Sequence, residues 1–180
     1  MKKRIHLFGA SGSGTTSIAA RAAEVLGYNH FDSDNYFWMP TEVPFTEERP
    51  NDECIAMMKQ DLEQSSRWFL SGSLSGWGEV LLSYFDLAVF VYAPQEIRLE
   101  RLRKRELKRY GEAVLPGGER YEATENFLGW CAAYEDGTRN GRSLAKHEAL
   151  LKRFECPVLR IVNLNFEESV DAVVQAVQKR

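Results

Sequence analysis

The residues with the clearest chemical potential form a glycine-rich stretch near the amino terminus. The stretch reads Gly9-Ala10-Ser11-Gly12-Ser13-Gly14-Thr15-Thr16-Ser17, after an apolar run and before an alanine-rich segment. A loop between a strand and a helix binds phosphate because its backbone N–H groups and the positive end of the helix dipole converge. We therefore expect an anion-binding loop at residues 9–17. The alternative is a turn that merely joins a strand to a helix.

The loop departs at one position from the phosphate-binding pattern G-x-x-x-x-G-K-S/T. Gly9 and Gly14 occupy the glycine positions, and Thr16 supplies the hydroxyl that holds Mg²⁺, but Thr15 replaces the lysine. That lysine normally reaches the β- and γ-phosphates and offsets their charge during phosphoryl transfer. Its loss leaves the backbone cradle intact. The sequence therefore favours phosphate binding more strongly than catalysis.

Two carboxylates follow the second expected strand. Asp32 and Asp34 stand two residues apart at the carboxyl end of that strand, where ligands bind in parallel sheets. Such a pair can serve Mg²⁺ and a substrate hydroxyl or amine. The alternative is an Asx turn in which Asp34 caps a helix.

A basic helix is expected from Gln95 to Tyr110, with seven basic residues against three acidic ones. Arg98, Arg101 and Arg105 recur at positions i, i+3 and i+7, so their guanidinium groups share one face and can converge on a polyphosphate. The alternative is a solvated charged face with internal Glu–Arg pairs.

Two segments are expected to border these residues. The aromatic and proline-rich segment 35–50 is expected to form a wall or flap with Arg49 as an anion clamp, or to pack its aromatic residues in the core. Residues 111–141 begin and end with glycines, which predicts a helical lid hinged on them, the alternative being a plain helical excursion. We expect His147, which follows this segment, to be a hydrogen-bonded, partly buried histidine and not a catalyst.

Alternating strands and helices position these residues. Apolar runs bounded by turn residues predict strands, and apolar residues at helical spacing predict helices, which together indicate a parallel α/β sheet. The expected strands are 3–8, 28–31, 67–70, 86–92 and 157–162, and the expected helices are 17–26, 51–65, 95–110, 142–154 and one that starts near 165.

Composition narrows the classes of protein. A chain of 180 residues with 44% hydrophobic and 27% charged residues is expected to form one globular domain. The net charge of −3 argues against general affinity for nucleic acid, and no apolar run reaches membrane-spanning length. The three widely spaced cysteines indicate reduced thiols in a cytoplasmic protein, not a disulfide framework or a zinc site.

With these motifs in place, the chain resembles, over nearly its whole length, the P-loop kinases of the adenylate kinase and shikimate kinase type. The run Phe31-Asp32-Ser33-Asp34 looks like the D-x-D of shikimate kinases, whose acids are associated with Mg²⁺ and the acceptor hydroxyl. The segment 86–105 looks like the nucleoside monophosphate kinase segment that enters the lid, where two arginines contact the ATP phosphates. Arg101 and Arg105 take their positions, and Arg142 is similar to the arginine that returns from the lid.

The resemblance implies a three-layer α/β/α P-loop NTPase fold with a helical lid. Its five-stranded parallel sheet would have the order 2-3-1-4-5, in a single domain of residues 1–180 with an acceptor-side segment at about 34–65 and a lid at about 107–146. ATP or another nucleoside triphosphate would bind the loop together with Arg101. The metal ligands would be Thr16 and Asp32, and the catalytic residues would be Asp34, Arg101, Arg105 and Arg142.

The function implied is an ATP-dependent kinase that phosphorylates a small molecule, with neither nucleic acid nor membrane as partner. Thr15 and Ser71-Gly72, which stands where adenylate kinases have Asp-Gly, both remove charge from the metal–phosphate site. The alternative is therefore a nucleotide-binding protein with little or no kinase activity. The phosphoryl acceptor, the base preference and the oligomeric state stay open.

Overall fold

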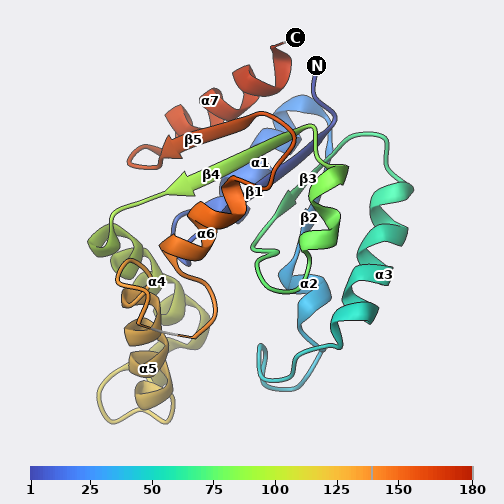
Figure 1. Ribbon diagram of the computed structural model, residues 1–180. Coiled ribbons are helices and arrows are strands. Elements are labelled where there is room, and N and C mark those ends of the chain that lie inside the picture. The colour runs from blue at the N-terminus through green and yellow to red at the C-terminus, as the bar shows by residue number, and fades with distance from the viewer. Residues whose placement is uncertain (139, 180) are drawn as a thin grey trace.

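A sheet of five parallel strands forms the centre of the molecule, in the order β2-β3-β1-β4-β5 (Figure 1). The structure is a computed structural model that describes residues 1–138 and 140–179. The predicted strand order is thereby confirmed. The strands span Arg4–Gly9 (β1), Asn29–Asp32 (β2), Trp68–Ser71 (β3), Leu87–Tyr92 (β4) and Val158–Val162 (β5).

Helices fill the connections between consecutive strands, as a parallel sheet requires. The α-helices span Thr15–Leu26 (α1), Asp34–Phe37 (α2), Asn51–Glu63 (α3), Gln95–Tyr110 (α4), Tyr121–Ala132 (α5), Leu144–Leu151 (α6) and Phe166–Gln178 (α7). Short 3-10 helices span Glu79–Tyr84 (η1) and Gly111–Val114 (η2). The sequence predicted α1, α3, α4, α6 and α7 to within a few residues, and α5 lies inside the helical segment expected at 111–141. A helix at Asp34 was one alternative, and α2 begins at that residue, whereas the sequence gave no signal for η1 or η2.

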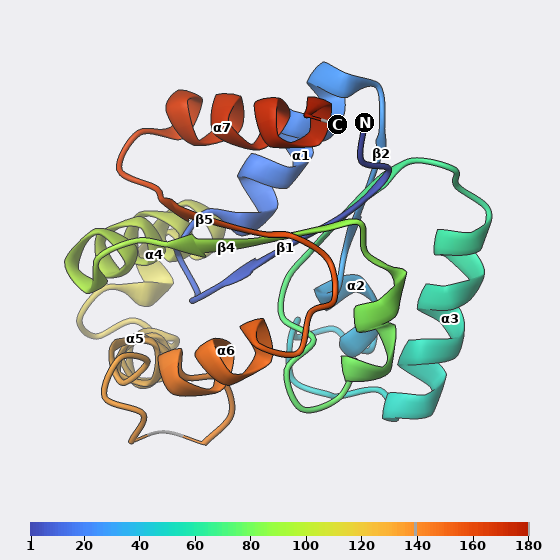
Figure 2. The ribbon, with the colours of Figure 1, turned by 45° about the horizontal axis from the view of Figure 1, so that its top comes forward.

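The sheet separates two hydrophobic cores, because successive side chains of a strand point to opposite faces. Ile5 and Leu7 of β1 pack with α1 and α7 on one face. Phe8 packs with α3, η1 and α6 on the other face. Figure 2 shows α1 and α7 on one side of the sheet and α3 and α6 on the other. The three-layer α/β/α architecture is confirmed.

The arm made by α4 and α5 extends beyond the carboxyl ends of the strands (Figure 1). Leu102 of α4 packs with Leu128 and Cys131 of α5 in a small core of its own. The predicted lid segment therefore contains a helix that is anchored to α4. In the described part of the chain, no helix combines the length and apolarity that a membrane crossing needs.

Candidate functional site

The glycine-rich loop joins the carboxyl end of β1 to the amino end of α1. Gly12 and Gly14 have φ angles of 80° and 98°, a left-handed conformation that glycine adopts without strain. Gly14 is the N-cap residue of α1, and no side chain caps this helix. The first amide groups of α1 therefore lack an intrahelical acceptor, and the helix dipole adds positive potential at the same place. This arrangement fits a phosphate group.

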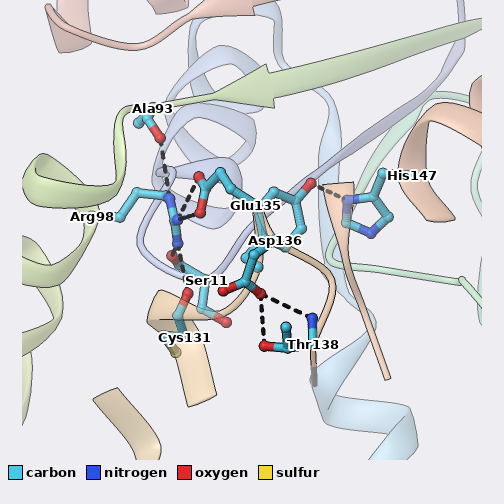
Figure 3. Close-up of polar contacts among 9 residues, drawn as sticks. Ser11, Ala93, Arg98, Cys131, Glu135, Asp136, Thr138 and His147 are labelled. Carbon is cyan, nitrogen blue, oxygen red and sulfur yellow. Dashed lines mark hydrogen bonds and ion pairs between the residues drawn. The ribbon is translucent and has the colours of Figure 1, made fainter. Parts of the chain in front are cut away.

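A buried arginine on α4 holds the loop in place. The side chain of Arg98 is fully buried, and its Nη2 donates to both carboxylate oxygens of Glu135 at 2.6 Å (Figure 3). Its Nη1 donates to the carbonyl oxygens of Ser11 and Cys131 at 3.3 Å, and its Nε donates to that of Ala93 at 3.1 Å. Arg98 thus ties the loop to the carboxyl end of α5.

The predicted convergence of the arginines of α4 on one ligand is therefore wrong for Arg98, because Glu135 and three carbonyl groups occupy its donors. The alternative of internal ion pairs holds for part of the helix. Lys104 pairs with Glu100 four residues earlier, and Arg105 donates through Nε and Nη2 to its neighbour Glu106.

Asn163, after β5, supports the loop from the other edge. Its Nδ2 donates to Ser13 O at 2.8 Å, and its Oδ1 accepts a hydrogen bond from the Ser169 hydroxyl at 3.2 Å. Its carbonyl oxygen accepts a hydrogen bond from Arg101 Nη2 at 3.1 Å. Nη1 of Arg101 is buried and has no hydrogen-bond partner among the described residues. Because an orphaned cationic donor is costly, it favours an anionic ligand near Asn163.

Asp32 is the carboxylate that meets the loop. Its Oδ2 accepts hydrogen bonds from the hydroxyls of Thr16 and Ser71, both at 2.8 Å, and its Oδ1 accepts one from the amide of Asp34 at 3.0 Å. His30 Nε2 lies 2.9 Å from Ser71 Oγ. The Asx turn considered from the sequence is formed by Asp32, and Asp34 is the first residue of α2 and not its cap.

Thr16 and Asp32 fit a magnesium ion because Mg²⁺ prefers hydroxyl, carboxylate and water oxygens. Within residues 1–138 and 140–179, no group of three or more His, Cys, Asp or Glu side chains is arranged to hold a metal ion. A cation at the loop would therefore depend on these two side chains, on water and on the phosphates of a ligand.

Asp34 and Arg142 lie near each other beside the loop. Burial and the negative charge of Asp32 raise the pKa of Asp34, and the charges of Arg142 and Arg105 oppose that shift. Arg142 Nη2 donates to Ser11 Oγ at 3.5 Å. The structure thus brings the carboxyl group of Asp34, the guanidinium group of Arg142 and the glycine-rich loop together.

The segment between α2 and α3 is a surface flap. Phe45 is 45% exposed and packs its ring against Trp38, with centroids 6.0 Å apart. The guanidinium of Arg109 on α4 lies 5.3 Å from the ring of Phe45, so the flap reaches the arm. Arg49 Nε donates to Tyr36 O at 2.9 Å. Arg49 was expected to clamp an anion, but its Nε–H group instead forms a hydrogen bond within the flap region.

His147 lies away from these groups, in the core beneath the sheet. It is fully buried, with Nδ1 2.7 Å from the Tyr134 hydroxyl and Nε2 3.1 Å from Ser73 Oγ. The predicted hydrogen bonds of His147 are confirmed, whereas its burial is complete and not partial as expected.

Sequence reasoning missed Glu135, the side chain of Asn163 and the contact between Ser71 and His30. Glu135 is 37 residues from Arg98, and Asn163 is 150 residues from Ser13, so no local spacing relates them. The only sequence signal is the place of Arg98 on α4, one turn before the apolar residue Leu102, which is typical of a buried position.

Comparisons with known proteins agree with this geometry. The family AAA_18, described as an AAA domain, matches residues 5–125. The chain is 45% identical over 175 residues to Uncharacterized protein YqaC of Bacillus subtilis (strain 168), which is 97% of each chain. It is also 32% identical over 116 residues to Cytidylate kinase of Archaeoglobus fulgidus, covering 58% of this chain and 63% of the other.

Two solved structures share the fold. Shikimate kinase from Acinetobacter baumannii in complex with shikimate has a TM-score of 0.57 at 17% identity and covers 97% of this chain and 92% of its own. Shikimate kinase from Bacteroides thetaiotaomicron has a TM-score of 0.59 at 16% identity, with coverage of 99% and 100%. These structures show the fold, and together with the family match and the similarity to a cytidylate kinase they confirm the resemblance inferred from the motifs.

Proposed function

We propose that this chain, which belongs to the AAA_18 family of AAA domains, is an ATP-dependent kinase that phosphorylates a small molecule. The observation that carries the proposal is the meeting of three groups at the carboxyl ends of β1 and β2. These are the uncapped helix N-terminus with its glycine loop, the Thr16–Asp32 pair and the carboxyl group of Asp34. We expect the reaction to take place in the cytoplasm.

In this reaction the γ-phosphoryl group passes from ATP, or another nucleoside triphosphate, to an acceptor hydroxyl, and the diphosphate leaves. The amides of residues 9–17 and the guanidinium of Arg101 bind the phosphates. Asp34 orients the acceptor and accepts its proton, as a carboxyl group with a raised pKa can do. Arg105 and Arg142 stabilise the charge that develops during transfer.

Thr16 and Asp32 would hold Mg²⁺, which supplies positive charge to the phosphate oxygens when bound. The acceptor would enter between the segment at about 34–65 and the lid at about 107–146. The flap contact between Phe45 and Arg109 supports this division, because it spans the two segments.

A second candidate is a nucleotide-binding protein with little or no kinase activity. Thr15 favours it, because loss of a cation at the transferred phosphates costs several kcal/mol of transition-state stabilisation. In that case closure of the lid over the nucleotide would signal to a partner.

A coupled assay of ADP release, screened over polyols, sugars, shikimate-like acids and nucleosides, separates the two candidates. The kinase predicts that at least one acceptor stimulates release and that Arg101→Ala lowers the rate. No stimulation by any acceptor, together with an unchanged basal rate in Arg101→Ala, contradicts it. A large gain of activity in Thr15→Lys would indicate a site that lost catalytic power with its lysine.

A further inference from the structure

A magnesium ion at the loop would depend on the orientation of one carboxylate, that of Asp32. Its Oδ2 accepts a hydrogen bond from the Thr16 hydroxyl at 2.8 Å. Among the described residues, no group of three or more His, Cys, Asp or Glu side chains could hold the ion instead. Groups that orient this carboxylate therefore affect how well the metal site forms.

Two further polar side chains, on β2 and β3, adjoin the carboxylate. Ser71 is the register partner of Asp32 across the parallel strand pair, and His30 lies two residues before Asp32 on the same face of β2. Ser71 is fully buried, whereas Thr16 is exposed. The carboxylate of Asp32 thus binds a hydroxyl on its buried side and another on its exposed side.

The hydrogen-bond donors in this group form a chain that ends on Asp32. Ser71 Oγ lies 2.8 Å from Asp32 Oδ2 and 3.4 Å from its other acceptor, Phe31 O, so the shorter bond to the carboxylate takes its proton. A hydroxyl that donates its one proton can only accept from a further partner. His30 Nε2, 2.9 Å from Ser71 Oγ, is therefore the protonated ring nitrogen and donates to it. Each donation polarises the next, which strengthens the bond to Asp32.

The backbone that carries this chain is closely packed. Ser33 N donates to Ser71 O at 2.8 Å, and Gly72 N donates to Leu7 O at 3.0 Å. Gly72 has a φ of +99°, and a Cβ at this position would collide with Ser33 Oγ. The carboxyl ends of β1, β2 and β3 are therefore held against one another, which gives the Ser71 hydroxyl a fixed position from which to orient Asp32.

We infer that His30 and Ser71 are positioning residues of the metal site, which orient the carboxylate of Asp32 toward Thr16 and the metal ion. The inference rests on the proposed function and adds two residues that act through Asp32. It separates binding of the nucleotide with its metal from binding of the nucleotide alone, because the backbone amides of the loop bind phosphate without Asp32.

Calorimetry of the full chain with AMP-PNP, in saturating Mg²⁺ and in EDTA, tests the inference. Ser71→Ala and His30→Leu remove the hydroxyl and the imidazole donor, so each should weaken binding in Mg²⁺ by about tenfold. Binding in EDTA should change by less than about twofold, which also shows that the variants fold. His30→Gln should stay within about threefold of the wild type in Mg²⁺, because the glutamine amide can donate from nearly the position of Nε2.

Ser65→Ala is the matched control. The Ser65 hydroxyl accepts a hydrogen bond from Asn29 Nδ2 at 2.9 Å beside the amino ends of the same two strands, so its loss removes a similar contact at the opposite end of the sheet. It should leave both affinities unchanged. The two His30 variants decide the test if Ser71→Ala does not fold.

Three results would overturn the inference alone: unchanged binding in Mg²⁺ in Ser71→Ala and His30→Leu, an equal loss in Mg²⁺ and in EDTA, or a loss in His30→Gln as large as that in His30→Leu. Equal affinity of the wild-type chain in Mg²⁺ and in EDTA would overturn the metal site together with the inference. A wild-type chain that binds AMP-PNP in neither condition would overturn the proposed function as well.

Discussion

Breaking the ion pair between Arg98 and Glu135 should destabilise the fold far more than breaking an exposed pair. The Arg98 side chain is fully buried, and that of Glu135 is 26% exposed. Removing one partner of a buried pair costs about 3–5 kcal/mol, because the other charge is left uncompensated. Three carbonyl groups stay on Arg98 and water reaches Glu135, so we expect Glu135→Gln to lower the free energy of unfolding by about 2–4 kcal/mol.

Urea denaturation and thermal melting measure this loss. At about 2–4 °C for each kcal/mol in a chain of this size, the melting temperature should fall by about 4–16 °C. Glu148→Gln breaks the pair with Arg160, whose side chains are 38% and 54% exposed, and should cost less than about 1 kcal/mol. The reasoning is refuted if Glu135→Gln destabilises the chain no more than Glu148→Gln does.

Three further outcomes are expected. In Gly12→Ala the new Cβ would lie 2.7 Å from Arg98 O at a φ of +80°, so calorimetry should show nucleotide affinity reduced by about tenfold or more, and normal affinity would contradict the loop geometry. Asp34→Asn should lower kcat by about a hundredfold or more with little change in nucleotide Kd, and an unchanged kcat would remove Asp34 from the reaction. Burial lowers the pKa of His6 to about 4. Because the unfolded chain, with a pKa of about 6.5, then binds more protons, stability should fall by up to about 3 kcal/mol as the pH drops from about 6.5 to 4. His6→Gln should flatten this dependence in urea titrations, and an unaltered slope would show that another group causes it.

The sheet and the loop could be predicted from the sequence because their signals are local. The apolar run before Gly9 and the helical pattern after Ser17 define a strand, a turn and a helix within a few residues of one another. The carboxyl ends of parallel strands share one edge, so the position of Asp32 beside Thr16 also follows from its place in the chain.

The contacts that support the loop could not be predicted, because they depend on how distant elements pack. The helical spacing places Arg98 on one face of α4, and this position is compatible with a ligand contact or with a buried ion pair. The contact with Glu135, which follows α5 in the chain, decides for the ion pair. The amide of Asn163 likewise reaches Ser13 only because β5 lies beside β4.

Residues 9–17 should bind a nucleoside triphosphate through their backbone amides without a lysine. This binding can be measured by calorimetric titration of the wild-type chain with Mg²⁺ and AMP-PNP, with adenosine as the reference. We expect saturable binding of the triphosphate and no detectable binding of adenosine. An absence of heat with every nucleoside triphosphate and with inorganic triphosphate would contradict it.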